Sequence, residues 1–124
     1  MKANCFEELN IWKSSRILVE KIYYITRQGK FLRDFGLSNQ FQRAVVSISV
    51  NIAEGFERNT RKEFMQFLYI SKGSCGEIRS LLYLALYLDY ISVNEFSKLK
   101  EHVIDLSKAI AAFIRYLKNN PQTK

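Results

Sequence analysis

Apolar residues recur along most of this chain at steps of three and four positions, the spacing of one face of an α-helix. The pattern predicts helices over about 9–27, 39–56, 61–90 and 93–117, and no segment alternates as a strand would. Four helices joined by short turns predict an all-α fold, an antiparallel up-down-up-down four-helix bundle, with 1–124 as a single domain. The fourth segment is the most regular, with Phe96, Leu99, Val103, Leu106, Ile110, Phe113 and Leu117 in its core seam.

Residues typical of helix ends support these boundaries. Thr60–Glu63 and Ser92–Glu95 each have the spacing of a capping box, and Ser38 is a plausible N-cap for the second helix. Gly55 suits the end of that helix, and the only proline, Pro121, follows the last helix. We expect the connection after the first helix to fold back onto the bundle through Phe31, Leu32 and Phe35.

The second helix is apolar on two sides. One row faces the expected core, and a second row of Val46, Val50 and Ala53 lies roughly opposite. A lone bundle does not need this second row, so we expect it to form the interface of a homo-oligomer. Between the rows runs a polar strip, which we interpret as a structural hydrogen-bond network in preference to a ligand site. Its members are Ser47, Asn51 and Glu54.

The third helix carries a stripe that mixes basic and aromatic residues: Met65, Tyr69, Lys72, Gly76, Arg79, Tyr83 and Tyr87. Such a stripe suits either nucleic acid or a protein interface, and the residues alone do not separate the two. We assign its basic members to phosphate contacts, and Tyr69 and Tyr83 to the oligomer interface. Gly73 and Gly76 should let a neighbouring helix approach closely, and Cys75 on the core row should be an inert buried thiol.

The formal net charge of +7 favours an acidic partner, with RNA or DNA first. The alternative interpretation is that these basic residues form an ordinary solvated surface with no specific partner. The predicted phosphate contacts are Arg43, Arg58, Arg61, Lys62, Lys72 and Arg79, and a further basic run comprises Lys108, Arg115, Lys118 and Lys124.

The sequence offers little for catalysis. His102 is the only histidine and is expected to be solvated, with no nucleophile beside it. Cys5 and Cys75 have no metal-binding spacing. We therefore expect no catalytic residues, no metal, no cofactor and no enzymatic activity. With neither a signal peptide nor a membrane-length apolar run, the expected location is the cytoplasm.

Several strings together resemble a known family. They are Phe6–Lys13, Gly36–Gln40, Arg43–Ile48 and Asn51–Gly55, continued by Leu88–Ile91. They are similar to the bacterial four-helix-bundle proteins first known from intervening sequences in 23S ribosomal RNA genes, a group that includes the accessory variability proteins of diversity-generating retroelements. The resemblance implies a ring-like homopentamer with a basic surface. It also implies nucleic-acid binding and a possible reverse transcriptase partner.

Two functions remain open at this point. The first is a non-enzymatic, oligomeric protein that binds RNA or DNA through phosphate contacts with little sequence specificity. The alternative is a protein–protein adaptor or scaffold, for example for a reverse transcriptase. The net charge favours the first function, and the doubly apolar second helix favours the alternative.

Overall fold

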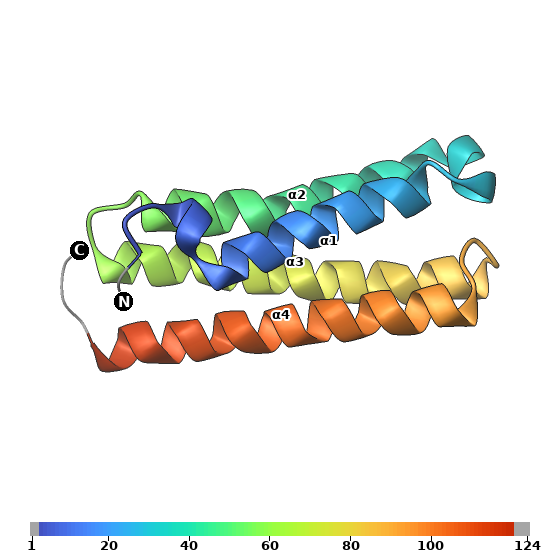
Figure 1. Cartoon of the computed structure of the whole chain (residues 1–124). Helices are drawn as coiled ribbons and strands as arrows, with labels where there is room; N and C mark the ends of the chain where they lie inside the picture. Colours follow the sequence, from blue (N-terminus) through green and yellow to red (C-terminus); the bar gives the residue numbers. More distant parts are fainter. Residues whose placement is uncertain (1–2, 121–124) are drawn as a thin grey trace.

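The computed structural model describes residues 3–120, in which four long helices alternate with short turns (Figure 1). Pro121 and Lys124 lie outside this range. The helices agree with the periodic segments of the sequence to within a few residues. In chain order the elements are the 3₁₀ turn η1 (Phe6–Glu8), α1 (Asn10–Thr26), the 3₁₀ turn η2 (Gly29–Arg33), α2 (Phe35–Phe56), α3 (Arg61–Tyr87) and α4 (Val93–Asn119).

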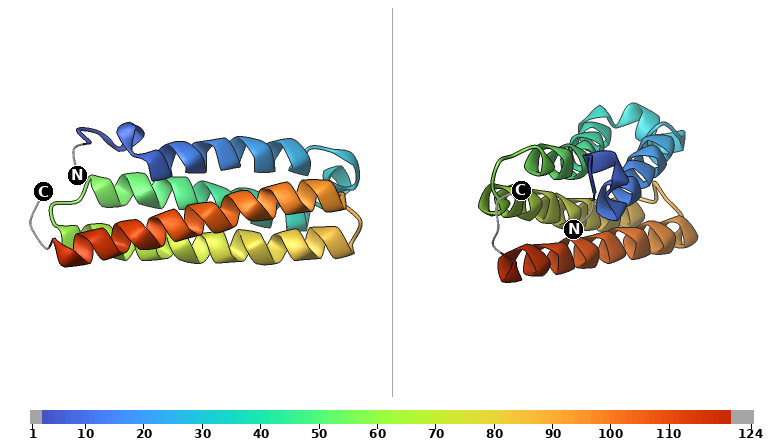
Figure 2. Two further views of the ribbon diagram at one scale, coloured as in Figure 1. Left: turned by 60° about the horizontal axis from the view of Figure 1, so that its bottom comes forward. Right: turned by 60° about the vertical axis from the view of Figure 1, so that its left-hand side comes forward.

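The four helices lie antiparallel in an up-down-up-down bundle (Figure 2). Each helix packs mainly on two neighbours: α2 on α1 and α3, and α4 on α3 and α1. The turn from α2 to α3 lies at the same end as η1, whereas η2 and the turn from α3 to α4 lie at the opposite end (Figure 1). The predicted bundle is therefore confirmed for the described residues. None of their helices is both long and apolar enough to cross a membrane.

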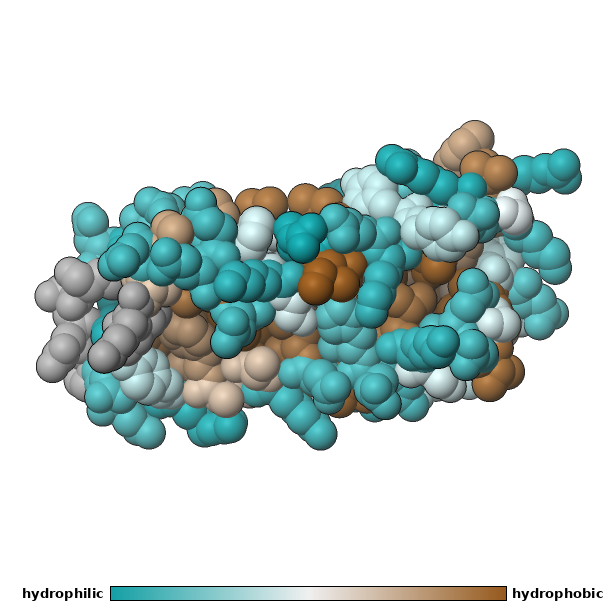
Figure 3. All heavy atoms as spheres, in the orientation of Figure 1, coloured by the Kyte–Doolittle hydropathy of each residue, from teal (hydrophilic) through white to brown (hydrophobic). Residues whose placement is uncertain are grey.

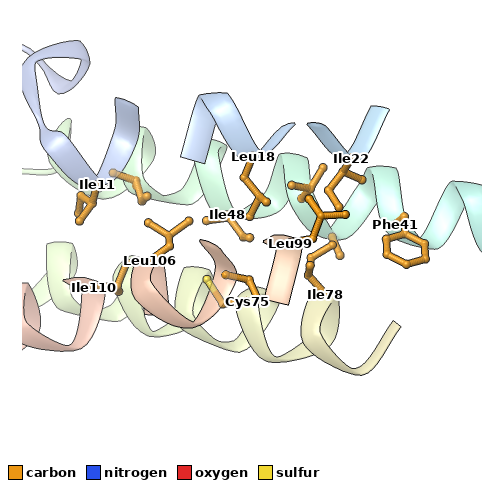
Figure 4. Packing of buried hydrophobic residues seen from close by; sticks show 14 of the residues in the cluster. Ile11, Leu18, Ile22, Phe41, Ile48, Cys75, Ile78, Leu99, Leu106 and Ile110 are labelled. Carbon is orange, nitrogen blue, oxygen red and sulfur yellow. The ribbon is translucent and has the colours of Figure 1, made fainter. Parts of the chain in front are cut away.

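One hydrophobic core runs the length of the bundle and takes residues from all four helices (Figure 4). Six of the seven residues predicted for the α4 seam are buried. Phe113 is only half-buried, and Ile114 takes the buried position beside it. A straight helix has 3.6 residues per turn, so a strict 3.5-residue repeat drifts off the core over several turns.

The predicted start of α2 was wrong. Asp34 caps the helix by accepting a hydrogen bond from the Leu37 N–H at 3.0 Å. Ser38 instead lies buried inside the helix, where its hydroxyl donates to the Phe31 carbonyl at 2.9 Å. Of the three apolar residues expected to fold back, only Phe31 is buried, whereas Leu32 and Phe35 are 56% and 74% exposed. Phe31 fills this end of the core by packing edge-on against Phe41 and Tyr90, with ring centroids 5.5 and 5.0 Å apart.

Both predicted capping positions at α3 and α4 are occupied, to different degrees. Ser92 and Glu95 form a complete capping box before α4. Thr60 accepts from the Glu63 N–H at 3.1 Å, while the Glu63 carboxylate accepts from the Thr60 hydroxyl. Helix α3 ends at Tyr87, three residues earlier than predicted. Asp89 then has a φ of 60°, a left-handed conformation that stops a helix.

Helices α2 and α3 approach each other closely at Gly55. A Cβ added at Gly55 would lie 2.8 Å from Phe64 Cδ1 and 2.9 Å from Phe67 Cβ. Gly55 lies one residue before the end of α2 at Phe56, as predicted, but it serves close packing there and does not adopt the left-handed conformation of a glycine cap. Further along, the Ser71 hydroxyl donates to the Ile48 carbonyl at 2.9 Å, and that of Ser74 donates to Ser47 Oγ at 3.0 Å.

Alanine substitutions at helix glycines should therefore have opposite effects on stability. Gly55→Ala should destabilise the fold by about 1–3 kcal/mol, since the added methyl group overpacks the α2–α3 contact. Gly73→Ala is the matched control, because a Cβ there meets nothing within 4 Å. It should stabilise by roughly 0.4–1 kcal/mol through the higher helix propensity of alanine. Urea unfolding of both variants measures this, and a stabilised Gly55→Ala variant would contradict the α2–α3 geometry.

Candidate nucleic-acid interface

A cationic groove runs along the outer side of the seam between α3 and α4, which lie side by side in Figure 2. At its centre is a depression of about 300 Å³. Lys72 and Arg79 reach it from α3, and Lys108 reaches it from α4. Gly76 and the half-buried Ile104 lie between them. The helix packing brings Lys108 of α4 close to Lys72 and Arg79, which lie two turns apart on α3.

The groove continues toward the α3–α4 turn through Lys100 and Tyr83. The Lys100 ammonium lies 5.2 Å from the centroid of the Tyr83 ring and 5.6 Å from that of Phe96. A hydrogen bond from Lys100 and the positive charges of Lys100 and Arg79 lower the pKa of the Tyr83 phenol. Lys100 thus extends the row of cations, and we define the groove by Lys72, Arg79, Lys100 and Lys108.

Carboxylates do not neutralise these cations. Between residues 3 and 120, the salt bridges are Arg16 with Glu20 at 2.7 Å and Arg58 with Glu54 at 3.1 Å, and neither lies in the groove. Glu101 and Asp105 line a neighbouring depression on α4 together with Lys100, whereas none of the described Asp or Glu residues lines the central depression of Lys72, Arg79 and Lys108. The groove therefore has a local excess of positive charge that a polyanion can neutralise.

The six predicted phosphate contacts have different surroundings in the structure, and only two of them line the groove. Lys72 and Arg79 lie in the groove, and Lys62 is exposed at the start of α3. Arg43 is exposed on α2, away from the groove, and Arg58 stacks on Phe67 with its Cζ 4.8 Å from the ring centroid. Sequence analysis did not single out Lys100. The signal for it was the i, i+4, i+8 row that places Lys100, Ile104 and Lys108 on one side of α4.

Arg61 has a structural role at the end of the groove. Its Nη1 donates to the Asn120 carbonyl at 3.0 Å, and its Cζ lies 5.5 Å from the centroid of the Tyr116 ring. These contacts join the start of α3 to the end of α4. Arg61 is therefore a poor choice for testing phosphate binding, because replacing it also removes this link.

Two of the three residues predicted for the polar strip form a hydrogen-bond network. Asn51 Nδ2 donates to the Ser47 carbonyl at 2.8 Å and to Ser47 Oγ at 3.0 Å, and Ser74 connects this pair to α3. Glu54 does not take part. It is exposed and pairs with Arg58 one turn later in α2, because its position in the helix points the carboxylate toward solvent.

The residues predicted for an oligomer interface differ in exposure. Val50 and Tyr69 are 54% and 50% exposed, whereas Val46 and Ala53 are half-buried. Tyr83 is also half-buried and packs edge-on against Phe96, with centroids 4.9 Å apart. The interface stays a prediction.

Of the small residues in this part of α3, Ser74 contacts α2 through Ser47, whereas the two glycines do not receive a neighbouring helix. A Cβ added at Gly73 or Gly76 would meet nothing within 4 Å, so the predicted close helix approach was wrong at these two positions. α2 and α4 pack on other faces of α3. Cys75 is 1% exposed beneath the depression, and burial raises the pKa of its thiol to about 12, which keeps it protonated. The predicted burial of the thiol is confirmed, and its lack of reactivity stays a prediction.

His102 is not the solvated histidine that the sequence predicted. It lies half-buried between α4 and α1, with Nε2 3.0 Å from Ser14 Oγ and Nδ1 3.2 Å from Lys21 Nζ. Lys21 can only donate, so Nδ1 accepts and the neutral ring carries its proton on Nε2, facing Ser14. A general base needs a lone pair there. The contact therefore joins two helices and does not activate the serine.

Comparison with known proteins shows to which family the chain belongs. The family described as 23S rRNA-intervening sequence protein matches residues 7–112. The chain belongs to this family. Similar solved structures include a protein of unknown function from the S23 ribosomal protein family of Bacteroides thetaiotaomicron, with a TM-score of 0.77 and 21% identity. The match covers 84% of this chain and 97% of that one. No curated protein matches.

The groove lies entirely within the residues that match the family. The other surface depressions are less suited to a polyanion. The one between α1 and α4, in the face shown in Figure 3, is lined by two lysines and two glutamates, so its charge is balanced. The one at η2 has Lys30 and Arg33, but the Asp34 carboxylate accepts from the lining Tyr90 hydroxyl at 2.8 Å.

The His102 contacts predict a pH dependence of stability. Burial and the Lys21 charge lower the pKa of His102 below 6.5, with smaller opposing effects from a hydrogen bond to the Ser14 backbone and from Asp105. The unfolded chain therefore binds the proton more readily, and stability falls as the pH drops from about 6.5 through the lower folded pKa. His102→Gln should lose less stability than the parent between about pH 7.5 and 5.5 in urea unfolding. Equal losses would contradict the buried, neutral imidazole.

Proposed function

We propose that this protein is a non-enzymatic, oligomeric protein that binds RNA or DNA through phosphate contacts, with little sequence specificity. The observation that carries the proposal is the α3–α4 groove, where Lys72, Arg79 and Lys108 converge without a carboxylate partner among the described residues. The net charge of +7 adds a long-range attraction for any polyanion.

Low sequence specificity follows from the kind of contact that the groove offers. Lysine and arginine on a shallow face reach phosphate oxygens, which are the same for every base. Reading a base sequence in duplex DNA requires a helix or strand inserted into a groove of the nucleic acid. In the described part of the chain, α3 and α4 lie flat along the face, so neither is placed to enter a major groove.

The proposed absence of catalysis rests on the surroundings of the titratable groups. The neutral His102 ring offers its proton to Ser14, and the Cys75 thiol is protonated and buried. Neither arrangement supplies an activated nucleophile. Among residues 3–120, no cluster of three or more His, Cys, Asp and Glu side chains is placed to bind a metal.

Phosphate binding predicts an affinity that falls steeply with salt. Lys72→Ala combined with Arg79→Ala should weaken binding to all sequences and flatten the log–log salt slope by about 1.4 for single strands, or about 1.8 for duplex DNA. Fluorescence anisotropy at several salt concentrations measures both effects.

The matched control is Lys13→Ala with Arg16→Ala. This pair also removes one lysine and one arginine, but from the exposed surface of α1. It should change affinity much less than the groove pair. Equal losses from both pairs would assign binding to net charge alone, and no binding at about 50 mM salt would reject the proposed function.

Self-association is proposed through the outer row of α2. Val50 is 54% exposed beside an apolar depression that Phe6 and Trp12 also line. An assembly, ring-like as in the family resemblance, would remove this surface from water and multiply the positive charge. A reverse transcriptase partner remains an expectation from that resemblance alone.

The oligomer is tested by light scattering on the parent protein and on Val50→Asp. The parent should have a multiple of the 14.6 kDa chain mass at micromolar concentration. Val50→Asp should dissociate it and leave the helical circular dichroism unchanged, because the side chain lies outside the core. A monomeric parent protein would reject the assembly.

A further inference from the structure

The exposed tyrosines beside the groove indicate which form of nucleic acid it accepts. We propose that the groove binds single-stranded RNA or DNA, with phosphates along Lys72, Arg79, Lys100 and Lys108 and with bases stacked on Tyr69 and Tyr87. This inference rests on the proposed phosphate-binding function and narrows its substrate to unpaired strands.

Tyr69 and Tyr87 are placed to act as stacking platforms. Their side chains are 50% and 74% exposed. Tyr69 lies three residues before Lys72, on the neighbouring turn of α3, and Tyr87 lies four residues after Tyr83. The Tyr87 ring contacts Tyr83 with centroids 6.2 Å apart and otherwise faces solvent. A large aromatic ring beside unneutralised cations is the combination that single-strand binding proteins use.

Tyr83 has a different role from its two neighbours. Phe96 lies 4.9 Å from its ring centroid and the Lys100 ammonium lies 5.2 Å away, so both partners compete with a base for the ring. It positions Lys100 in the row of phosphate contacts. Along α3, Tyr69 comes before the residues that line the cationic depression and Tyr87 comes after them, so one exposed ring lies toward each end of it.

The floor of the groove lets a strand lie close to the helix backbone. Gly76 lines the depression between Lys72 and Arg79, and a Cβ there would meet no atom of the chain within 4 Å. A glycine inside a helix is less favourable than an alanine, and packing within the described chain does not offset this at Gly76. A ligand lying on the depression would use the space that a side chain would otherwise fill.

A duplex fits this face less well than a single strand. Its bases are paired and stacked inside, so Tyr69 and Tyr87 could not reach them without unstacking. A rigid duplex lying on a flat bundle face also presents few phosphates to one row of cations. A flexible single strand can follow the row and offer bases to the rings on either side.

The test compares a single-stranded oligonucleotide of about 12 nucleotides with the duplex of the same sequence by fluorescence anisotropy. The parent protein should bind the single strand at least about tenfold more tightly. Tyr87→Ala should weaken single-strand binding by about five- to 150-fold, the range expected for one lost base stack, and leave duplex binding unchanged. Tyr69→Ala should behave alike, and Tyr87→Phe should retain the parent affinity because the ring remains.

Tyr24→Ala is the matched control, since Tyr24 is 65% exposed on α1 and lies away from the groove. The Tyr24→Ala variant should bind both the single strand and the duplex with the affinity of the parent protein. Light scattering on each variant checks whether the assembly is intact. If Tyr69→Ala changes the mass of the assembly, the binding result for Tyr87→Ala alone decides the test. Salt-dependent binding that is equal for both forms and insensitive to the tyrosines would overturn this inference and leave the phosphate-binding function standing. Absence of salt-dependent binding to either form would reject both.

Discussion

The close contact between α2 and α3 fixes the direction in which every face of α3 points. Gly55 lets the two backbones approach at Phe64 and Phe67, and the Ser71 and Ser74 hydroxyls join the helices further along. These contacts fix both the separation and the rotation of α3. Its core row, which includes Cys75 and Ile78, then faces inward, and Lys72 and Arg79 face outward beside α4. Direct packing of α4 on α3, as between Phe96 and Tyr83, then sets the cations of the two helices beside each other.

The sequence predicted the fold well because the fold depends on periodicity. The seam of α4 and the capping residues Thr60 and Ser92 depend on residues close together in the sequence. The structure contains both caps and most of the predicted seam. Two positions were interpreted incompletely, the first because two nearby residues compete for one cap and the second because its contact lies on another helix. Ser38 had the right chemistry for a cap, but Asp34 occupied that position four residues earlier. Gly55 resembled a helix end, and only the approach of Phe64 reveals its packing role.

The candidate site was only partly predictable for the same reason. The stripe on α3 contained Lys72 and Arg79, so half of the groove was visible in one helix. Lys100 belongs to it only because α4 runs antiparallel beside α3 and places Lys100 next to Tyr83. Conversely, Arg58 and Arg61 were reasonable phosphate contacts by charge. Both have partners within the chain, Glu54 and Phe67 for the first and Asn120 and Tyr116 for the second. No count of charges along the sequence distinguishes an engaged arginine from one that is available.

The central claim is that nucleic acid binds along the seam between α3 and α4, and mapping of backbone amide chemical shifts during titration with a short oligonucleotide tests it most directly. The account predicts that the largest shifts fall on Lys72, Gly76, Arg79 and Lys108, with little change in α1. Shifts concentrated at Ile17 and Tyr24 in the α1–α4 depression, or at Lys30 and Arg33 in η2, would contradict it.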